Sequence, residues 1–194
     1  PVATPMAEKT NKPGRIAVVD IGSNTVRLVV YEVPTRLPFP LFNEKASCRL
    51  GLGVAQTGHL NPDGVKEALR SLTRFVRLAS AMGVQRMELV ATAAVRNADD
   101  GAKFVAKVEK RFGVRVRVLS GDEEARSAAL GLLSGVPEAD GLLGDLGGSS
   151  LDLVVLEKGV FGRYSTLPLG HLRLGEVAAS DRAHVPEMIA EEIA

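Results

Sequence analysis

The sequence predicts an α/β fold in which a three-stranded hairpin sheet wrapped by helices occurs twice, with the second copy truncated. Hydrophobic residues make up 45% of the 194 residues, which is enough for a substantial core. The stretch DIGSNTVRLVV begins at Asp20, and the similar stretch DLGGSSLDLVV begins at Asp145. Each combines an aspartate, a glycine turn and a strand, so the repeat indicates an internal duplication.

The elements of the first copy follow from hydrophobic periodicity and from turn and capping residues. β-Branched or alternating runs predict strands at residues 15–21, 25–33, 41–50, 86–92 and 114–120. Three prolines predict an irregular loop at Pro34, Pro38 and Pro40. Asn61 followed by Pro62 is typical of a helix start. Apolar residues at helical spacing predict helices at residues 61–83, about 100–113 and 120–134.

The second copy follows a linker around Pro137. Strands are expected up to Asp145, over 151–157 and over 160–167, the last two joined by a Lys-Gly turn. The final ten residues are typical of a helix that begins at Pro186 without a C-terminal cap, so the chain is expected to stop within a domain. The predicted organisation is a disordered arm, a first domain and an incomplete second domain, at residues 1–14, 15–136 and 137–194.

Composition excludes several classes of protein. Lys and Arg number 24 against 23 for Asp and Glu, and a net charge of +1 excludes a strongly basic nucleic-acid binder. The single cysteine, Cys48, cannot support a disulfide framework and favours a reducing, cytoplasmic setting. No run approaches the roughly 18 apolar residues of a membrane span. We therefore expect neither membrane nor nucleic acid as a partner.

Both turns combine residue types that bind phosphate. Glycine lets the backbone approach an anion closely, successive amides form an anion-binding nest, and short polar side chains add donors. Asp20 and Asp145 end the preceding strands, where a carboxylate can hold Mg²⁺ or its water shell. Hairpin chemistry would explain one such turn, but two matching copies favour phosphate. The candidate phosphate-binding residues are Gly22, Ser23, Asn24, Thr25, Gly147, Gly148, Ser149 and Ser150.

Five segments resemble, in order, the motifs of the exopolyphosphatase and guanosine pentaphosphate phosphohydrolase family. They read DIGSNTVRLVV, ATAAVRNADD, LSGDEEARSAALG, GDLGGSSLDLVV and LPLGHLRL, and the resemblance runs from about residue 16 to residue 174. The resemblance implies the ribonuclease-H-like fold of actin and sugar kinases, with mixed sheets flanked by helices in two domains around a cleft. It also implies magnesium dependence and release of the terminal phosphate from a polyphosphate chain.

Three side chains outside the turns are candidates for the chemistry. Arg96, expected in a loop after the strand over 86–92, suits bidentate contact with phosphate, although a solvated surface arginine is the alternative. Ser120 begins a Ser-x-x-Glu capping box, which assigns Glu123 to the helix cap. Glu124 is then left to orient or deprotonate the attacking water, with Glu123 as the runner-up.

Two positions depart from the family pattern Gly-Gly-Gly-Ser-x-Glu. Ser149 replaces a glycine, and Asp152 replaces a glutamate that is longer by one methylene, a difference in reach of about 1.5 Å. Asp152 joins Asp20 and Asp145 as an expected metal ligand and is expected to act through water. A chain that ends within the second domain is expected to fold. It is also expected that such a chain can lack catalytic turnover.

Other polar groups carry weaker signals. A basic cluster could guide a polyanion by long-range attraction or form a solvated helix face. Arg173 matches a family position near the cleft. The three histidines lack metal-ligand spacing and are expected to be structural or exposed. The cluster comprises Lys103, Lys107, Lys110, Arg111, Arg115 and Arg117, and the histidines are His59, His171 and His184.

The function that the motifs favour is Mg²⁺-dependent hydrolysis of a phosphoanhydride, with inorganic polyphosphate or guanosine pentaphosphate as the substrate. Two alternatives belong to other classes: a non-catalytic sensor of polyphosphate or an alarmone nucleotide, and an ATP-dependent kinase of the same superfamily. The segment SGDEEA favours the hydrolase, because a kinase base would be placed to serve a sugar hydroxyl. Cytoplasmic location and homodimerisation are further expectations.

Overall fold

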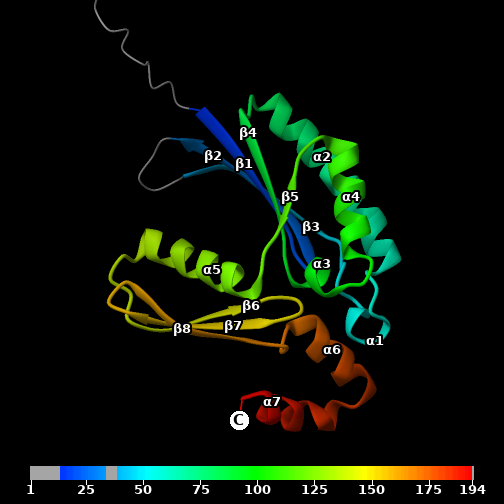
Figure 1. The fold of residues 1–194 in the computed structure, drawn as a ribbon, viewed down its shortest axis with the longest axis vertical. Coiled ribbons are helices and arrows are strands. Elements are labelled where there is room, and N and C mark those ends of the chain that lie inside the picture. Colours follow the sequence, from blue (N-terminus) through cyan, green and yellow to red (C-terminus); the bar gives the residue numbers. More distant parts are fainter. Residues whose placement is uncertain (1–13, 34–38, 194) are drawn as a thin grey trace, which may run out of the picture.

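The structure is a computed structural model that describes residues 14–33 and 39–193 (Figure 1). The arm predicted at residues 1–14 lies outside the described residues except for Gly14, which opens the first strand. The loop predicted around Pro34 and Pro38 also lies outside them, whereas Pro40 begins a strand.

The first sheet is mixed and has the strand order β3-β2-β1-β4-β5. Antiparallel pairing joins β1 to β2 and β2 to β3, whereas β4 and β5 continue the sheet parallel to β1. This arrangement puts the carboxyl ends of β1 and β4 at the same edge, which is where the first glycine turn begins. The strands are β1 (Gly14–Ile21), β2 (Thr25–Val33), β3 (Pro40–Ser47), β4 (Arg86–Ala91) and β5 (Val116–Val118).

Four helices accompany this sheet. The two long ones lie on the same side of it, away from the second sheet (Figure 1). As predicted, Asn61 caps the first long helix, since its side chain accepts a hydrogen bond of 3.2 Å from the Asp63 amide. The apolar sides of these helices and of the sheet share one core, which includes Leu28, Leu72 and Phe75. The helices are α1 (Val54–Thr57), α2 (Pro62–Ala81), α3 (Ala93–Asn97) and α4 (Gly101–Phe112).

The second sheet is an antiparallel meander of β6 (Gly141–Leu146), β7 (Leu151–Glu157) and β8 (Val160–Leu167). Helix α5 (Gly121–Gly135) precedes it, and Ala125 and Ala129 on that helix share a small core with Val154 and Leu156 of β7. The predicted boundary after residue 136 thus falls between a helix and the sheet on which it packs. The division into two domains stays a prediction.

Several local predictions are corrected. Arg96 lies in α3 rather than in a loop, because its Ala-Ala-Val-Arg-Asn segment forms one helical turn after Thr92. The third strand ends at Ser47 and not at residue 50, since Arg49 turns the chain with a φ of 53°. The strand predicted over 114–120 is reduced to Val116–Val118.

One helix of the second half was not expected from the sequence. Helix α6 (His171–Ser180) follows β8, and a short 3-10 turn then leads into α7 (Val185–Ile193), the helix predicted to begin at Pro186. The N-cap of α6 is Gly170, which supplies no side-chain hydrogen bond, so the usual polar start signal is missing. Within the described ranges, no helix is long and apolar enough to span a lipid bilayer.

Candidate phosphate-binding site

The two repeated turns have the same hydrogen-bonding pattern. The Gly22 amide donates to the Thr25 carbonyl at 2.9 Å, and the Gly147 amide donates to the Ser150 carbonyl at 2.8 Å. Each turn therefore closes over four residues between two antiparallel strands. The amides of these two glycines are used inside the turns, so only the amides that follow them are left for a ligand.

The rest of the chain anchors the first turn through its carbonyls. The Asn24 carbonyl accepts hydrogen bonds from the amides of Cys48 and Arg49 at 2.9 and 2.8 Å. The Ser23 carbonyl accepts one from the Gly51 amide at 2.8 Å. In a planar trans peptide the N–H points opposite to the C=O. The Asn24 amide therefore points away from the segment that anchors the turn.

Helix α6 anchors the second turn in the same way. The Gly147 carbonyl accepts a hydrogen bond from the His171 amide at 3.1 Å, and the Gly148 carbonyl accepts one from the Leu172 amide at 2.9 Å. The amides of Gly148 and Ser149 consequently point away from α6. Within the described part of the chain, neither of these amides nor that of Asn24 donates a hydrogen bond. Unpaired amides of this kind can bind an anion.

Both turns line one cavity of about 350 Å³. The predicted placement of Asp20 and Asp145 at a common cleft agrees with this cavity, since both aspartates line it. Glu124 also contributes to its wall, whereas Glu123, Arg96 and Asp152 do not. The full lining is Asp20, Gly22, Ser23, Asn24, Thr25, Arg27, Thr92, Ala93, Glu124, Asp145, Leu146, Gly147, Gly148, Ser149, Ser150 and His171.

Burial raises the pKa of two carboxylates near the cavity, and a neighbouring carboxylate adds to each shift. Burial raises the pKa of Asp20, and the nearby Asp145 adds to this increase although Arg27 opposes it. Asp152 lies opposite Asp145 in the β6–β7 pairing and is 3% exposed. Burial is the main cause of its raised pKa, and Asp145 contributes as well. The Asp152 Oδ1 atom is buried without a hydrogen-bond partner, so it is open to a donor or a cation.

These carboxylates do not form a complete metal site by themselves. Among the described residues, no group of three or more His, Cys, Asp or Glu side chains is arranged to hold a metal. Mg²⁺, however, usually binds through one or two carboxylates, water and substrate phosphates. The unpartnered oxygen of Asp152 beside Asp145 fits that mode of binding.

Glu123 and Glu124 have different environments. The Glu123 carboxylate accepts a hydrogen bond from the Ser120 amide at 2.9 Å, and the Ser120 hydroxyl accepts one from the Glu123 amide at 3.2 Å. This is the predicted capping box, and the bond from the Ser120 amide lowers the pKa of Glu123. Burial instead raises the pKa of Glu124, with Asp152 and Asp20 adding to the shift.

Arg96 contacts Glu124 rather than the cavity. Its Nη1 atom donates to Glu124 Oε2 at 3.0 Å and to the Leu119 carbonyl at 2.7 Å. This hydrogen bond opposes the rise in the pKa of Glu124. Arg96 thus fixes the glutamate side chain at the cavity wall, and the predicted direct contact between Arg96 and phosphate stays a prediction.

His171 is a cavity residue that the sequence predicted only to be structural or exposed. Its Nδ1 lies 2.9 Å from the Gly147 carbonyl, and its Nε2 lies 3.1 Å from the Asn24 side-chain nitrogen. A carbonyl only accepts, so we assign the proton to Nδ1, and Nε2 then accepts from the Asn24 amide group. His171 therefore joins the two turns directly.

Two further arginines lie at or near the cavity. Arg27 lines the cavity opposite Asp20, and it occupies the place in the first repeat that Asp152 occupies in the second. An alignment of the two repeats would have singled out Arg27, because it places this arginine at the position of Asp152. Arg173 lines a neighbouring hollow of about 330 Å³ that shares Ser149 with the cavity.

Removing the His171 bridge should weaken anion binding. For His171→Ala we expect the dissociation constant for phosphate to rise about twofold to tenfold, the usual worth of one or two hydrogen bonds. The matched control is His184→Ala, which removes an exposed histidine whose Nδ1 lies 3.2 Å from Glu187. Isothermal titration with phosphate should show the loss for the first variant only, and equal affinities would contradict the bridging role.

The chain is similar to known phosphatases over most of its length. The model of the Ppx/GppA phosphatase family matches residues 29–193. Exopolyphosphatase 2 of Mycobacterium tuberculosis is 30% identical over 173 residues, which are 84% of this chain and 54% of that protein. Exopolyphosphatase 1 of the same species is 30% identical over 142 residues, which are 72% of this chain and 41% of that protein. The chain thus spans about half the length of these relatives.

Solved structures show the same similarity. The Ppx/GppA family member of Aquifex aeolicus matches with a TM-score of 0.72 and 29% identity, over 84% of this chain and 54% of that one. An exopolyphosphatase from Cytophaga hutchinsonii matches with a TM-score of 0.78 and 27% identity, over 84% and 53% of the two chains. These matches confirm the predicted α/β, actin-like fold class and the resemblance drawn from the five motifs. The chain belongs to the Ppx/GppA phosphatase family.

Proposed function

We propose that this protein is a phosphoanhydride hydrolase that releases the terminal phosphate from inorganic polyphosphate. The observation that carries the proposal is the cavity that Glu124 lines together with the residues of both turns whose amides are unpaired. The names of the relatives support the class of substrate. Guanosine pentaphosphate is the alternative substrate within the same reaction class.

The roles of the residues follow from what phosphoryl transfer requires, which is positioning and neutralisation of charge. The amides of Asn24, Gly148 and Ser149 would hold the terminal phosphate. Glu124 would orient the attacking water and accept its proton, and a raised pKa suits that task near neutral pH. Arg96 would act as a positioning residue by holding the Glu124 carboxylate.

Mg²⁺ is the cofactor that we propose for this site. Asp145 at the cavity wall and its strand neighbour Asp152 would hold it, directly or through water, and Asp20 is a further carboxylate of the wall. When bound, it would neutralise charge on the substrate phosphates. The support comes from the unpartnered oxygen of Asp152 and from the raised pKa values of Asp20 and Asp152, which burial causes and to which Asp145 adds.

This assignment predicts how stability depends on pH. Because the pKa of Asp152 is raised in the folded state, the folded protein keeps the proton to a higher pH than the unfolded chain does. The free energy of unfolding should therefore fall as pH rises from the ordinary aspartate range through the raised pKa. For Asp152→Asn, without Mg²⁺, we expect a gain of about 1 kcal/mol at neutral pH that disappears in acid.

With Mg²⁺ added, the natural protein should become more stable than the Asp152→Asn variant. Mg²⁺ should raise the thermal midpoint of the natural protein, since a ligand that binds only the folded state stabilises it. Asp152→Asn should lose most of that rise, whereas the exposed control Asp140→Asn should keep it. Equal responses of the two variants to Mg²⁺ in thermal melts would exclude Asp152 as a ligand.

The proposed activity is tested with the full-length protein. Phosphate release should be measured with polyphosphate, guanosine pentaphosphate and ATP supplied separately, with and without Mg²⁺. We expect Mg²⁺-dependent release from polyphosphate. Tight binding of polyphosphate without release would favour the sensor, and transfer of phosphate from ATP to an acceptor would favour the kinase. Cytoplasmic location and a homodimer stay predictions.

A further inference from the structure

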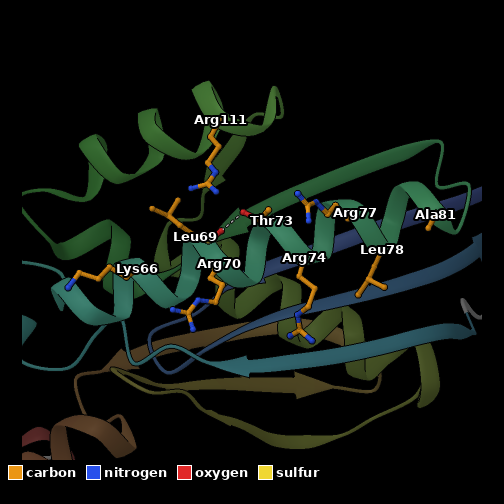
Figure 2. A pocket seen from close by; sticks show the side chains of 9 residues that line it. All are labelled: Lys66, Leu69, Arg70, Thr73, Arg74, Arg77, Leu78, Ala81 and Arg111. Atoms are coloured by element: carbon orange, nitrogen blue, oxygen red, sulfur yellow. Dashed lines mark hydrogen bonds between the residues drawn. The ribbon is translucent and has the colours of Figure 1, made fainter.

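A second charged feature lies outside the cavity, on the exposed side of α2. It is a hollow of about 800 Å³ whose lining contains five cationic side chains and no acidic one. Figure 2 shows Arg111 extending from α4 toward α2, whereas Arg70 and Arg74 extend away from α4. Leu69 and Leu78 form its apolar floor, and both pack into the main core. We call the cations Lys66, Arg70, Arg74, Arg77 and Arg111 the basic stripe.

Four members of the basic stripe follow one another along α2. These four members fall within about 80° of one another around the helix axis, as 3.6 residues per turn requires for this spacing. They extend over about 16 Å along the helix at 1.5 Å per residue. A line of positive charges at regular intervals complements a linear polyanion better than it complements a compact anion.

The members of the stripe are available to a ligand. Lys66 pairs with Asp63 at 2.9 Å and Arg70 with Glu67 at 3.2 Å, both on the exposed surface. Exposed pairs of this kind contribute little to stability, so phosphate can replace them. Arg74 is paired with Glu44. Arg77 and Arg111 have no acidic partner among the described residues.

A path leads from the cavity to the basic stripe. Asn24 and His171 line the cavity and also a neighbouring hollow of about 470 Å³, to which Arg49 contributes a cation and Glu176 a carboxylate. The first turn of α2 packs on the backbone at Arg49, since a Cβ added to Gly64 would lie 3.0 Å from the Arg49 carbonyl oxygen. The helical turn that contains Lys66 therefore packs on the chain segment to which Arg49 belongs.

We propose that the basic stripe binds the distal part of a long polyphosphate chain whose terminal phosphate occupies the cavity, with Arg49 between the two sites. The inference rests on the proposed function for the identity of the ligand. It adds a dependence on chain length, because a chain that is bound in the cavity alone gains no contact with the basic stripe. Short chains would use the cavity alone.

The test compares two variants that each lose two positive charges. Arg77→Gln/Arg111→Gln removes the two unpaired members of the stripe. The control Arg86→Gln/Arg163→Gln removes two exposed arginines that do not line the hollow. For the stripe variant we expect the dissociation constant for long-chain polyphosphate to rise about fivefold, as for the loss of two exposed ion pairs. The affinity for tripolyphosphate should stay the same.

Salt dependence gives a second readout that a merely structural effect would not change. Each lost phosphate contact should lower the slope of log affinity against log salt by about 1, so the stripe variant should lose about 2. In the full-length protein, KM for the long chain should rise while kcat is unchanged. Equal effects on long and short chains, or no effect on either, would overturn the proposal. Binding of duplex DNA but not of polyphosphate at the stripe would overturn it too.

The outcomes also separate this inference from the proposed function. If the natural protein releases no phosphate from either chain, the proposed function fails, and the binding measurements still decide whether the basic stripe holds polyphosphate. If it releases phosphate from both chains and the stripe variant matches the control, the proposed function holds and the inference fails.

Discussion

Replacing Glu124 with alanine in the full-length protein is expected to lower the rate of phosphate release by about 10² to 10⁴, the usual contribution of a general base. The carboxylate lies at the cavity wall, held 3.0 Å from Arg96, and burial raises its pKa toward the range where it can accept a proton. Stability should change little, because the variant loses a hydrogen bond but also a partly buried charge. Steady-state rates and thermal midpoints measure both effects.

The matched control is the neighbouring glutamate. Glu123→Ala removes one half of the capping box, so it should lower the thermal midpoint while reducing the rate much less. In the natural protein the rate should also fall as the pH drops through the raised pKa of Glu124, since protonation removes the base. The opposite pattern, with the rate lost in Glu123→Ala and stability lost in Glu124→Ala, would show that the two roles are exchanged.

The second large effect is expected for Gly148→Ala. A Cβ added at Gly148 would lie 2.9 Å from the Ser23 Cβ and 3.1 Å from the Asn24 amide nitrogen. Both neighbours belong to the other turn, and their backbone is anchored, so the two turns would be forced apart. We expect a loss of about 1 to 3 kcal/mol of stability, the range found for overpacked sites. Phosphate affinity should fall at least about tenfold, because the amides no longer converge.

Gly131→Ala is the control for this substitution. Gly131 lies in the exposed part of α5, and a Cβ added there would have no atom within 4 Å. Alanine should therefore raise stability by about 0.5 to 1 kcal/mol through its helix propensity, without changing phosphate binding. If Gly148→Ala binds phosphate as well as Gly131→Ala does, the close approach of the two turns is not required for the site.

Features that depend on neighbouring residues in the sequence were predictable. The capping box at Ser120 and the start of α2 at Asn61 involve side chains that bond to amides a few residues away. The strands on either side of each turn were predicted because glycine turns and β-branched runs alternate there. The duplication followed from comparing Asp20 with Asp145, and the structure gives both turns the same internal hydrogen bond.

Features that depend on tertiary contacts were not predictable. Helix α6 begins after Gly170 without a polar cap, and it is held by hydrogen bonds to the second turn. His171 acquires its place in the cavity only because this helix begins there. An arginine at position 96 could contact either phosphate or Glu124, and the sequence does not distinguish the two. Only the folded chain shows the hydrogen bond to Glu124. Sequence spacing carries no information on such choices.

The central claim is that the two turns form one phosphate site. The most direct measurement is a crystal structure of this chain, from crystals that were grown in or soaked with phosphate at a saturating concentration. We expect phosphate in the cavity, with its oxygens accepting hydrogen bonds from the amides of Asn24, Gly148 and Ser149. A well-ordered cavity that contains no phosphate under these conditions, or phosphate bound at only one turn and facing away from the other, would contradict the claim.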